Sequence, residues 1–226
     1  MLNVGVLISG RGSNLQALID ESQKPGRPWK IDCVVSNNPE APGIGRALTA
    51  KVPVHVVNHR DFSNREAFEK AMDAKLNEHG VQLVCMAGFM RLLTPWFVTR
   101  WRDKLINIHP SLLPAFPGLD THKKALDYGA KFTGCTVHFV RAEMDHGPII
   151  IQAAVPVLPG DTEESLSARV LEAEHKIYPD AVRLIAEGRV NIIEERVLVT
   201  GVETSIEATI NPSGALGLAR PKAKSS

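Results

Sequence analysis

The sequence predicts an α/β fold: an open, mostly parallel twisted sheet with helices on both faces and antiparallel strands in its C-terminal part. Short apolar runs alternate with segments of helical periodicity through most of the 226 residues. The runs are apolar at consecutive positions, which is typical of strands buried on both faces of a parallel sheet. After Pro110 two longer β-type segments follow each other across a polar turn, which favours an antiparallel pair.

Five strands are expected before residue 110, each a short apolar run followed by a turn or a helix: 2–8, 31–35, 54–57, 81–87 and 105–108. Helices are expected between them, from residue 15, over 44–50, from 63 and from 95. Ser63 and Glu66 have the spacing of a capping box for the third of these helices. Thr94 and Pro95 are typical of the cap and the first residue of the fourth.

The C-terminal part is expected to hold two strands, a long helix and a small strand, over 132–140, 148–155, 161–187 and 190–193. From Asn211 onward the composition of Pro, Gly, Ala, Lys and Ser predicts a loose end. We therefore expect one domain over residues 1–195, with an N-terminal half at 1–106 and a C-terminal half at 107–195. A C-terminal extension over 196–226, flexible at its end, would follow.

Composition excludes several classes of protein. The chain has 26 Lys and Arg against 25 Asp and Glu, a net charge of +1, which disfavours a nucleic-acid partner. No apolar run approaches the ~20 residues of a membrane-spanning helix, and the N-terminus lacks the basic leader of a signal peptide. Three distant cysteines without a CxxC pair argue against disulfides and a zinc site. These features favour a cytoplasmic enzyme.

A glycine-rich loop joins the first strand to the first helix. Gly10 and Gly12 allow a close approach of the backbone to a ligand, and the start of a helix attracts anions. The loop lacks the Gly-Lys-Ser/Thr of a P-loop and the third glycine of a dinucleotide fingerprint. A single phosphate held by backbone amides, Ser13 and Asn14 fits better. The alternative is a tight turn in which Ser13 or Asn14 caps the helix.

Two polar residues interrupt the fifth strand. Asn107 and His109 alternate with apolar neighbours, so both side chains emerge on one face, near the carboxyl end where open α/β sheets bind ligands. A histidine can transfer protons near neutral pH, and an amide can stabilise an oxyanion. The alternative is a pair of satisfied polar core residues. Asp145 alone would be an ordinary turn acid.

Other polar residues carry weaker signals. Glu174 lies in the long helix, where charged residues usually form a solvated face, and His122 is most simply a helix-surface residue. A metal site built from His109, His122, Asp145 and His146 is conceivable, but these residues have no recognised ligand spacing, and none is predicted.

Six segments occur together in the order of one known family: 10–16, 87–92, 107–114, 138–140, 145–148 and 174–179. Over roughly residues 2 to 195 the chain resembles the phosphoribosylglycinamide formyltransferases, which are folate-dependent enzymes of purine synthesis. The resemblance implies a Rossmann-like formyltransferase fold. It also implies formyl transfer from 10-formyltetrahydrofolate to the amine of 5-phosphoribosylglycinamide, giving formylglycinamide ribonucleotide and tetrahydrofolate in de novo purine biosynthesis.

The resemblance also implies roles for individual residues. The catalytic group would be Asn107, His109 and Asp145. The substrate phosphate would bind to Gly12, Ser13 and Asn14, and its ribose hydroxyls to Glu174. The 10-formyltetrahydrofolate would contact a larger set: Arg65, Met90, Arg91, Leu92, Leu93, Asn107, Arg141, Ala142, Glu143, Met144 and Asp145. The N-terminal half would thus bind phosphate and the C-terminal half would carry the catalytic and folate-binding residues. Partners would be small molecules, with no nucleic acid, membrane or metal, and the protein would be a monomer or homodimer.

The implied chemistry is coherent. Attack of the substrate amine on the formyl carbon creates a tetrahedral oxyanion, which Asn107 and protonated His109 would stabilise. A neighbouring Asp145 would favour the charged imidazolium. Two other users of 10-formyltetrahydrofolate, methionyl-tRNA formyltransferase and formyltetrahydrofolate deformylase, are the alternatives, but each would be expected to carry a further domain. A non-catalytic phosphosugar- or folate-binding protein is a third alternative, distinguished by binding without turnover.

Overall fold

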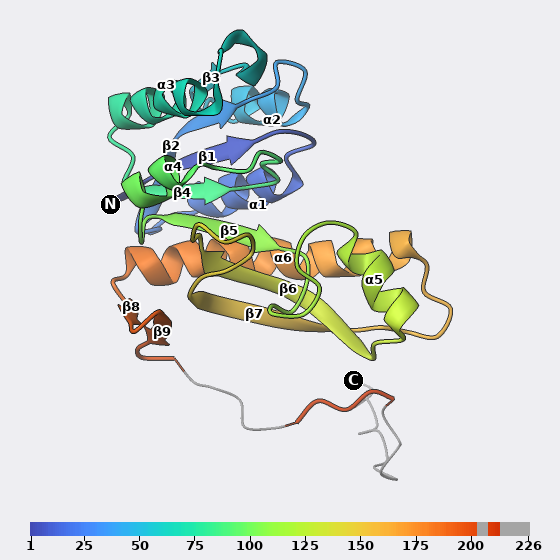
Figure 1. Cartoon of the computed structure of the whole chain (residues 1–226). Helices are drawn as coiled ribbons and strands as arrows, with labels where there is room; N and C mark the ends of the chain where they lie inside the picture. Colours follow the sequence, from blue (N-terminus) through green and yellow to red (C-terminus); the bar gives the residue numbers. More distant parts are fainter. Residues whose placement is uncertain (203–207, 213–226) are drawn as a thin grey trace.

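A seven-stranded sheet forms the centre of the molecule in the computed structural model, which describes residues 1–202 and 208–212 (Figure 1). Its strand order is β3-β2-β1-β4-β5-β6-β7. The strands are β1 (Leu2–Ile8), β2 (Trp29–Ser36), β3 (Val54–Val56), β4 (Leu83–Met86), β5 (Leu105–His109), β6 (Phe132–Phe139) and β7 (Ile149–Pro156). Pairs among β1–β5 are parallel, whereas β5–β6 and β6–β7 are antiparallel, which confirms the predicted fold class.

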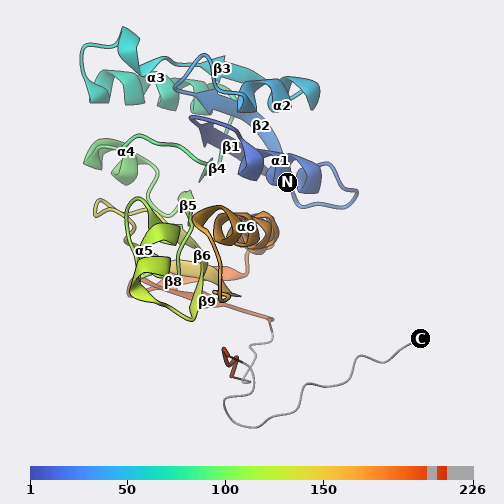
Figure 2. The same cartoon turned by 90° about the vertical axis from the view of Figure 1, so that its right-hand side faces the viewer.

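Helices cover both faces of this sheet, and Figure 2 separates the two layers. The helices are α1 (Ser13–Ser22), α2 (Gly43–Thr49), α3 (Arg65–Glu78), α4 (Pro95–Arg100), α5 (Thr121–Tyr128) and α6 (Glu163–Ala186), with a 3₁₀ turn, η1, over His59–Asp61. One core cluster holds buried residues of α1, α2 and α6, and a second holds those of α3 and α4. Alternate residues of β1 serve the two clusters, because Val6 packs into the first and Leu7 into the second.

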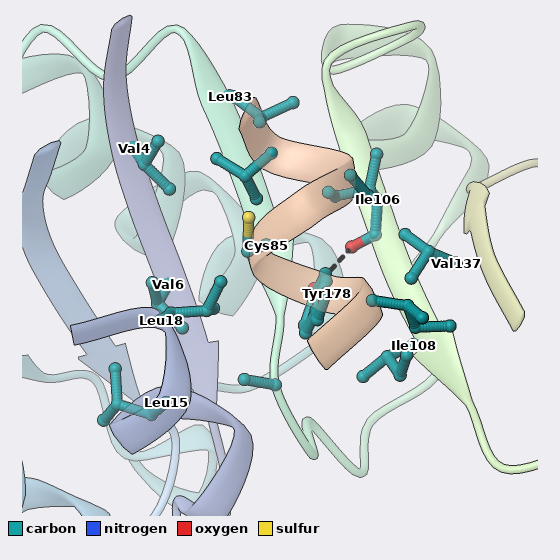
Figure 3. Packing of buried hydrophobic residues seen from close by; sticks show 14 of the residues in the cluster. Val4, Val6, Leu15, Leu18, Leu83, Cys85, Ile106, Ile108, Val137 and Tyr178 are labelled. Carbon is teal, nitrogen blue, oxygen red and sulfur yellow. Dashed lines mark hydrogen bonds between the residues drawn. The ribbon is translucent and has the colours of Figure 1, made fainter. Parts of the chain in front are cut away.

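Tyr178 of α6 joins the helix to the middle of the sheet (Figure 3). Its ring is fully buried, and its hydroxyl group donates to the carbonyl oxygen of Met86 at 2.9 Å and lies 3.4 Å from that of Ile106. Burial raises the pKa of Tyr178 well above its usual value, so the hydroxyl stays protonated and serves as a donor. The contact fixes α6 against β4 and β5, the two strands next to the site described below.

The predicted helix caps are right for α4 and wrong for α3. Pro95 opens α4 after the N-cap residue Thr94. In α3 the N-cap is Asn64, whose side chain accepts a 2.8 Å hydrogen bond from the backbone N–H of Ala67. An asparagine is at least as good a cap as a serine, and it takes the place one residue later than the capping box predicted for Ser63.

The chain continues after α6 into a hairpin. The predicted strand β8 (Val190–Ile193) pairs antiparallel with β9 (Arg196–Val199), which was not predicted. Farther along, the side chain of Asn211 donates to the carbonyl oxygens of Lys131 and Val157. Of the extension expected over 196–226 with a flexible end, residues 203–207 and 213–226 lie outside the described part of the chain. Within residues 1–202 and 208–212, no helix is long and apolar enough to cross a membrane.

Candidate active site

His109 and Asp145 meet although they belong to different segments of the chain. His109 ends β5, and Asp145 lies in the turn between β6 and β7. Its Oδ1 is 3.4 Å from Nδ1 of His109, and the two side chains are only 6% and 11% exposed. The structure therefore brings together two of the three residues predicted to be catalytic, and Asp145 is more than an ordinary turn acid.

The second ring nitrogen of His109 also faces an acceptor. Nε2 lies 3.1 Å from the carbonyl oxygen of Phe116, in the loop after β5. A carbonyl and a carboxylate can only accept hydrogen bonds, so both ring nitrogens are satisfied together only when both carry protons. Asp145 and Phe116 thus place an acceptor oxygen beside each nitrogen of the His109 ring.

The turn that carries Asp145 folds back along β5. At its start, the backbone N–H of Val140 donates to the carbonyl oxygen of Leu105, at the beginning of β5. Five residues later Asp145 reaches His109 at the end of the same strand. The second carboxylate oxygen of Asp145 accepts a 2.7 Å hydrogen bond from the N–H of Gly118. Asp145 consequently links the turn, the strand and the loop after it.

Asn107, the third predicted catalytic residue, is paired across the sheet with His138 of β6. Its Nδ2 lies 3.4 Å from Nε2 of His138, and Nδ1 of His138 lies 3.0 Å from the carbonyl oxygen of Phe139. Burial lowers the pKa of His138, so the ring is neutral, donates through Nδ1 and accepts through Nε2. This contact uses one N–H of the Asn107 amide and leaves the other for a ligand. No role was predicted for His138, although a polar residue on a buried strand is itself an indication of a functional site.

Gly12 shapes the predicted phosphate loop. It is the N-cap residue of α1 with φ 71°, and a Cβ atom there would lie 2.7 Å from Cα of Gly43. No side chain caps α1, so the alternative in which Ser13 or Asn14 caps the helix is wrong. The first intrahelical bond runs from the N–H of Gln16 to the carbonyl oxygen of Gly12, which leaves the amides of residues 13–15 without helical partners. Such a helix start suits an anion.

Asn14 and Glu174 are joined inside the protein. Nδ2 of Asn14 donates a 2.7 Å hydrogen bond to Oε2 of Glu174, and the side-chain oxygen Oδ1 of Asn14 is buried without a hydrogen-bond partner among the residues that the structure describes. Glu174 is 6% exposed, so the expectation of a solvated helix face is wrong at this position. Burial raises the pKa of Glu174, and the hydrogen bond from Asn14 partly opposes that effect. The predicted phosphate loop and the predicted ribose-binding residue are therefore neighbours.

Two of the residues predicted to bind folate line one surface pocket. Arg65, the first residue of α3, and Arg91, in the loop after β4, line it with His59, Phe62, Asn64 and Phe68. In the same loop Met90 and Leu92 are strongly exposed, whereas Leu93 packs partly against the second core cluster. This segment is tied to the phosphate loop, because the N–H of Met90 donates to Oγ of Ser9 at 2.8 Å.

The remaining predicted folate residues form the start of the turn after β6. Ala142, Glu143 and Met144 are exposed. Arg141 is mostly buried, and its guanidinium group is held by the carboxylates of Asp103 and Glu195. Its side chain is therefore engaged within the protein.

The conceivable metal ligands do not assemble. Among residues 1–202 and 208–212, no group of three or more His, Cys, Asp or Glu side chains could hold a metal ion. His146 is exposed, and Nδ1 of His122 is buried without a protein partner. Burial lowers the pKa of His122, so this ring is held neutral.

The chain is similar to proteins of known family over most of its length. Residues 2–182 match the model of a family described as formyl transferase. Over 191 residues the chain is 51% identical to the human trifunctional purine biosynthetic protein adenosine-3, an alignment that covers 84% of this chain and 19% of that protein. The chain thus spans about a fifth of the length of this relative.

Two single-function relatives match over nearly their whole length. Phosphoribosylglycinamide formyltransferase of Escherichia coli K12 is 42% identical over 200 residues, which cover 88% of this chain and 94% of that enzyme. The crystal structure of glycinamide ribonucleotide transformylase 1 from Symbiobacterium toebii superposes with a TM-score of 0.86 at 49% identity, covering 88% of this chain and 94% of that one.

Proposed function

The chain belongs to the formyl transferase family, among the phosphoribosylglycinamide formyltransferases, and from this membership we propose its reaction. It transfers the formyl group of 10-formyltetrahydrofolate to the amine of 5-phosphoribosylglycinamide. The products are formylglycinamide ribonucleotide and tetrahydrofolate, and the step belongs to de novo purine biosynthesis. The observation that carries the proposal is the contact between Asp145 and His109, because His109 lies on β5, the strand that also holds Asn107.

The reaction needs groups that stabilise negative charge on the formyl oxygen more than it needs a base. When the amine attacks the formyl carbon, negative charge develops on the formyl oxygen, the free N–H of Asn107 donates to it, and a protonated His109 stabilises it through its positive charge. Asp145 supplies the counter-charge for the ring. As the tetrahedral intermediate collapses, the amine loses a proton and the folate nitrogen gains one, so no proton is consumed overall.

The ribonucleotide lies across the ends of β1 and β5. Its phosphate accepts from the amides at the start of α1, with Gly12, Ser13 and Asn14 around it. Its ribose hydroxyls donate to the carboxylate of Glu174, which the hydrogen bond from Asn14 orients. The amine then points toward Asn107 and His109.

The formyl donor lies along the loop after β4 and the turn after β6. The exposed apolar side chains of Met90, Leu92 and Met144 suit the flat pterin ring. Arg65 and Arg91 provide positive charge in one pocket, which suits carboxylates of the donor. Each substrate is thus bound by a few side chains and backbone amides, as is typical of enzymes that act on small molecules.

A reconstituted assay tests the proposal. Purified protein is supplied with 5-phosphoribosylglycinamide and 10-formyltetrahydrofolate, and release of the deformylated folate is followed by its absorbance. We expect turnover that requires both substrates and falls by a factor of roughly 10²–10³ in Asn107→Ala. Release of formate from the donor without the ribonucleotide would indicate a deformylase, and binding of both compounds without turnover would indicate a non-catalytic protein.

A further inference from the structure

The turn between β6 and β7, residues 141–147, begins with an arginine whose side chain is bound at several points. The Arg141 side chain is only 12% exposed. Nη2 donates to Oδ1 of Asp103 at 2.7 Å, and Nε donates to Oε2 of Glu195 at 2.5 Å. Nη1 donates to the carbonyl oxygen of Val140 at 3.2 Å. The guanidinium group is thus held on three sides, which restricts the direction in which the turn leaves β6.

Both carboxylates come from connections outside the candidate active site. Asp103 lies between α4 and β5, and Glu195 lies in the tight turn of the β8–β9 hairpin. Their backbones have φ values of 60° and 58°, which few non-glycine residues adopt. Glu195 also contacts Arg102 through its second oxygen, so its carboxylate links two arginines. The C-terminal hairpin is consequently attached to the start of the turn.

The same side chain also lies close to the far end of the turn. Gly147 has φ 133°, and a Cβ atom there would lie 2.0 Å from the carbonyl oxygen of Phe139 and 3.1 Å from Cγ of Arg141. The stem of Arg141 therefore packs beside both ends of the seven-residue turn. Asp145, which contacts His109, lies between these ends.

We propose that Glu195, acting with Asp103 through Arg141, is a positioning residue for the turn that places Asp145 beside His109 and closes on the formyl donor. The proposal rests on the function proposed above. An isolated ion pair at a surface contributes little, but here one largely buried guanidinium group is bound by two carboxylates at once. Loss of one carboxylate frees the start of the turn while the sheet and the phosphate loop stay intact.

The chain offers a matched control in the same hairpin turn. Glu194 precedes Glu195 and has a similar backbone, with φ 49°. Within the described residues its carboxylate makes no hydrogen bond or ion pair. Glu194→Gln and Glu195→Gln therefore remove the same charge from adjacent positions, but only the second removes a carboxylate that forms an ion pair with Arg141.

The first measurement is independent of activity. Trypsin must insert an arginine side chain into its own specificity pocket, so an Arg141 held by carboxylates resists cleavage even though residues 142–144 are exposed. Limited trypsin digestion followed by mass spectrometry gives the rate of cleavage between residues 141 and 142. We expect this rate to rise roughly 3- to 10-fold in Glu195→Gln and in Asp103→Asn, and to stay unchanged in Glu194→Gln.

The second measurement is steady-state kinetics with each substrate varied. In Glu195→Gln we expect kcat/KM for 10-formyltetrahydrofolate to fall roughly 3- to 10-fold, with the KM for the ribonucleotide and the melting temperature unchanged. Equal behaviour of Glu195→Gln and Glu194→Gln in both measurements would overturn the proposal. So would a lower melting temperature with equal losses for both substrates, since that result describes a merely structural contact. If the unchanged protein transferred no formyl group, the proposed function would fail, and the cleavage rates would still decide whether Glu195 holds Arg141.

Discussion

Oδ1 of Asp145 lies 3.4 Å from Nδ1 of His109, and this contact joins the turn after β6 to the end of β5. The opposite nitrogen of the ring faces the carbonyl oxygen of Phe116. An imidazolium can donate to both oxygens, whereas a neutral ring can donate to only one. Asp145 and Phe116 therefore flank the His109 ring on opposite sides, and the number of hydrogen bonds that the ring can make to them depends on its protonation.

Replacement of Asp145 by Asn tests which form of His109 works. The imidazolium loses its counter-charge, so activity should fall progressively as the pH rises, and the alkaline limb of kcat/KM should move to lower pH. Profiles of kcat/KM against pH for both proteins, with folding checked at each pH, measure the shift. An acid limb that moves downward while activity survives at mildly acidic pH would identify neutral His109 as the working base. Loss at every pH without a shift would mean that Asp145 orients groups and does not tune charge.

Asn107→Ala should mainly lower kcat, by a factor of roughly 10²–10³, because a single oxyanion donor is lost. His138→Phe keeps a ring of similar size but removes the acceptor that holds the Asn107 amide, so a smaller loss of kcat is expected there. Initial rates at saturating concentrations of both substrates give these values. A change confined to KM in Asn107→Ala would make the amide a ground-state binding group.

Gly12 and Gly10 form a matched pair for testing the phosphate loop. Gly12→Ala places a Cβ atom 2.7 Å from Cα of Gly43 at a residue with φ 71°, so the loop must shift. Gly10→Ala meets nothing within 4 Å. We expect Gly12→Ala to raise the KM for the ribonucleotide at least about tenfold with little effect on the KM for the formyl donor, since a misplaced amide loses charge-assisted hydrogen bonds. Gly10→Ala should resemble the unchanged protein, and an equal loss of affinity for both substrates in Gly12→Ala would show a folding element instead of a phosphate site.

Glu174→Gln should change the pH dependence of stability. Burial raises the folded-state pKa of Glu174 above its usual value of 4.5, so the folded protein binds this proton more tightly than the unfolded chain does. The stability that this tighter binding contributes is complete at low pH and is lost as the pH rises through the folded-state pKa. Glutamine does not titrate, so the melting temperature of the variant, relative to the unchanged protein, should increase from about pH 4 to about pH 8. A difference that is constant with pH would contradict the argument, and the variant should bind the ribonucleotide weakly at every pH.

The order of apolar runs and helical periodicity predicted the sheet and most helices, because a strand buried on both faces, such as β4 (Leu83–Met86), is apolar at every position. The exact cap residue of a helix was harder to predict where two adjacent residues are both suited to that position. Ser63 and Asn64 are both good cap residues, and only the geometry of the chain selects Asn64. No strong turn signal precedes β9 in the sequence, because the hairpin turn is made by Glu194 and Glu195.

The candidate site was predicted where the chemistry lies in one segment. Asn107 and His109 are two residues apart on one strand, so their common face follows from the period of a strand. His138, the partner of Asn107, was missed because only the tertiary fold brings it close, and Asp145 was expected beside His109 only from the family resemblance. His138 is 31 residues from Asn107 in the sequence, and no local pattern reports that pairing. The same holds for Glu195, which is 54 residues from Arg141.

The path of the turn after β6 sets a limit on its length. Val140 lies beside Leu105, and Asp145 reaches His109, so the turn must travel the length of β5, about 13 Å for four steps of ~3.3 Å. Five residue steps extend to at most about 18 Å. Five steps therefore exceed this length by about 5 Å, whereas four steps, about 14 Å, would exceed it by only about 1 Å. Removing one residue between Val140 and Asp145 would thus require an almost fully extended peptide to keep the backbone of Asp145 level with His109, whereas a deletion after Asp145 would leave this distance unchanged.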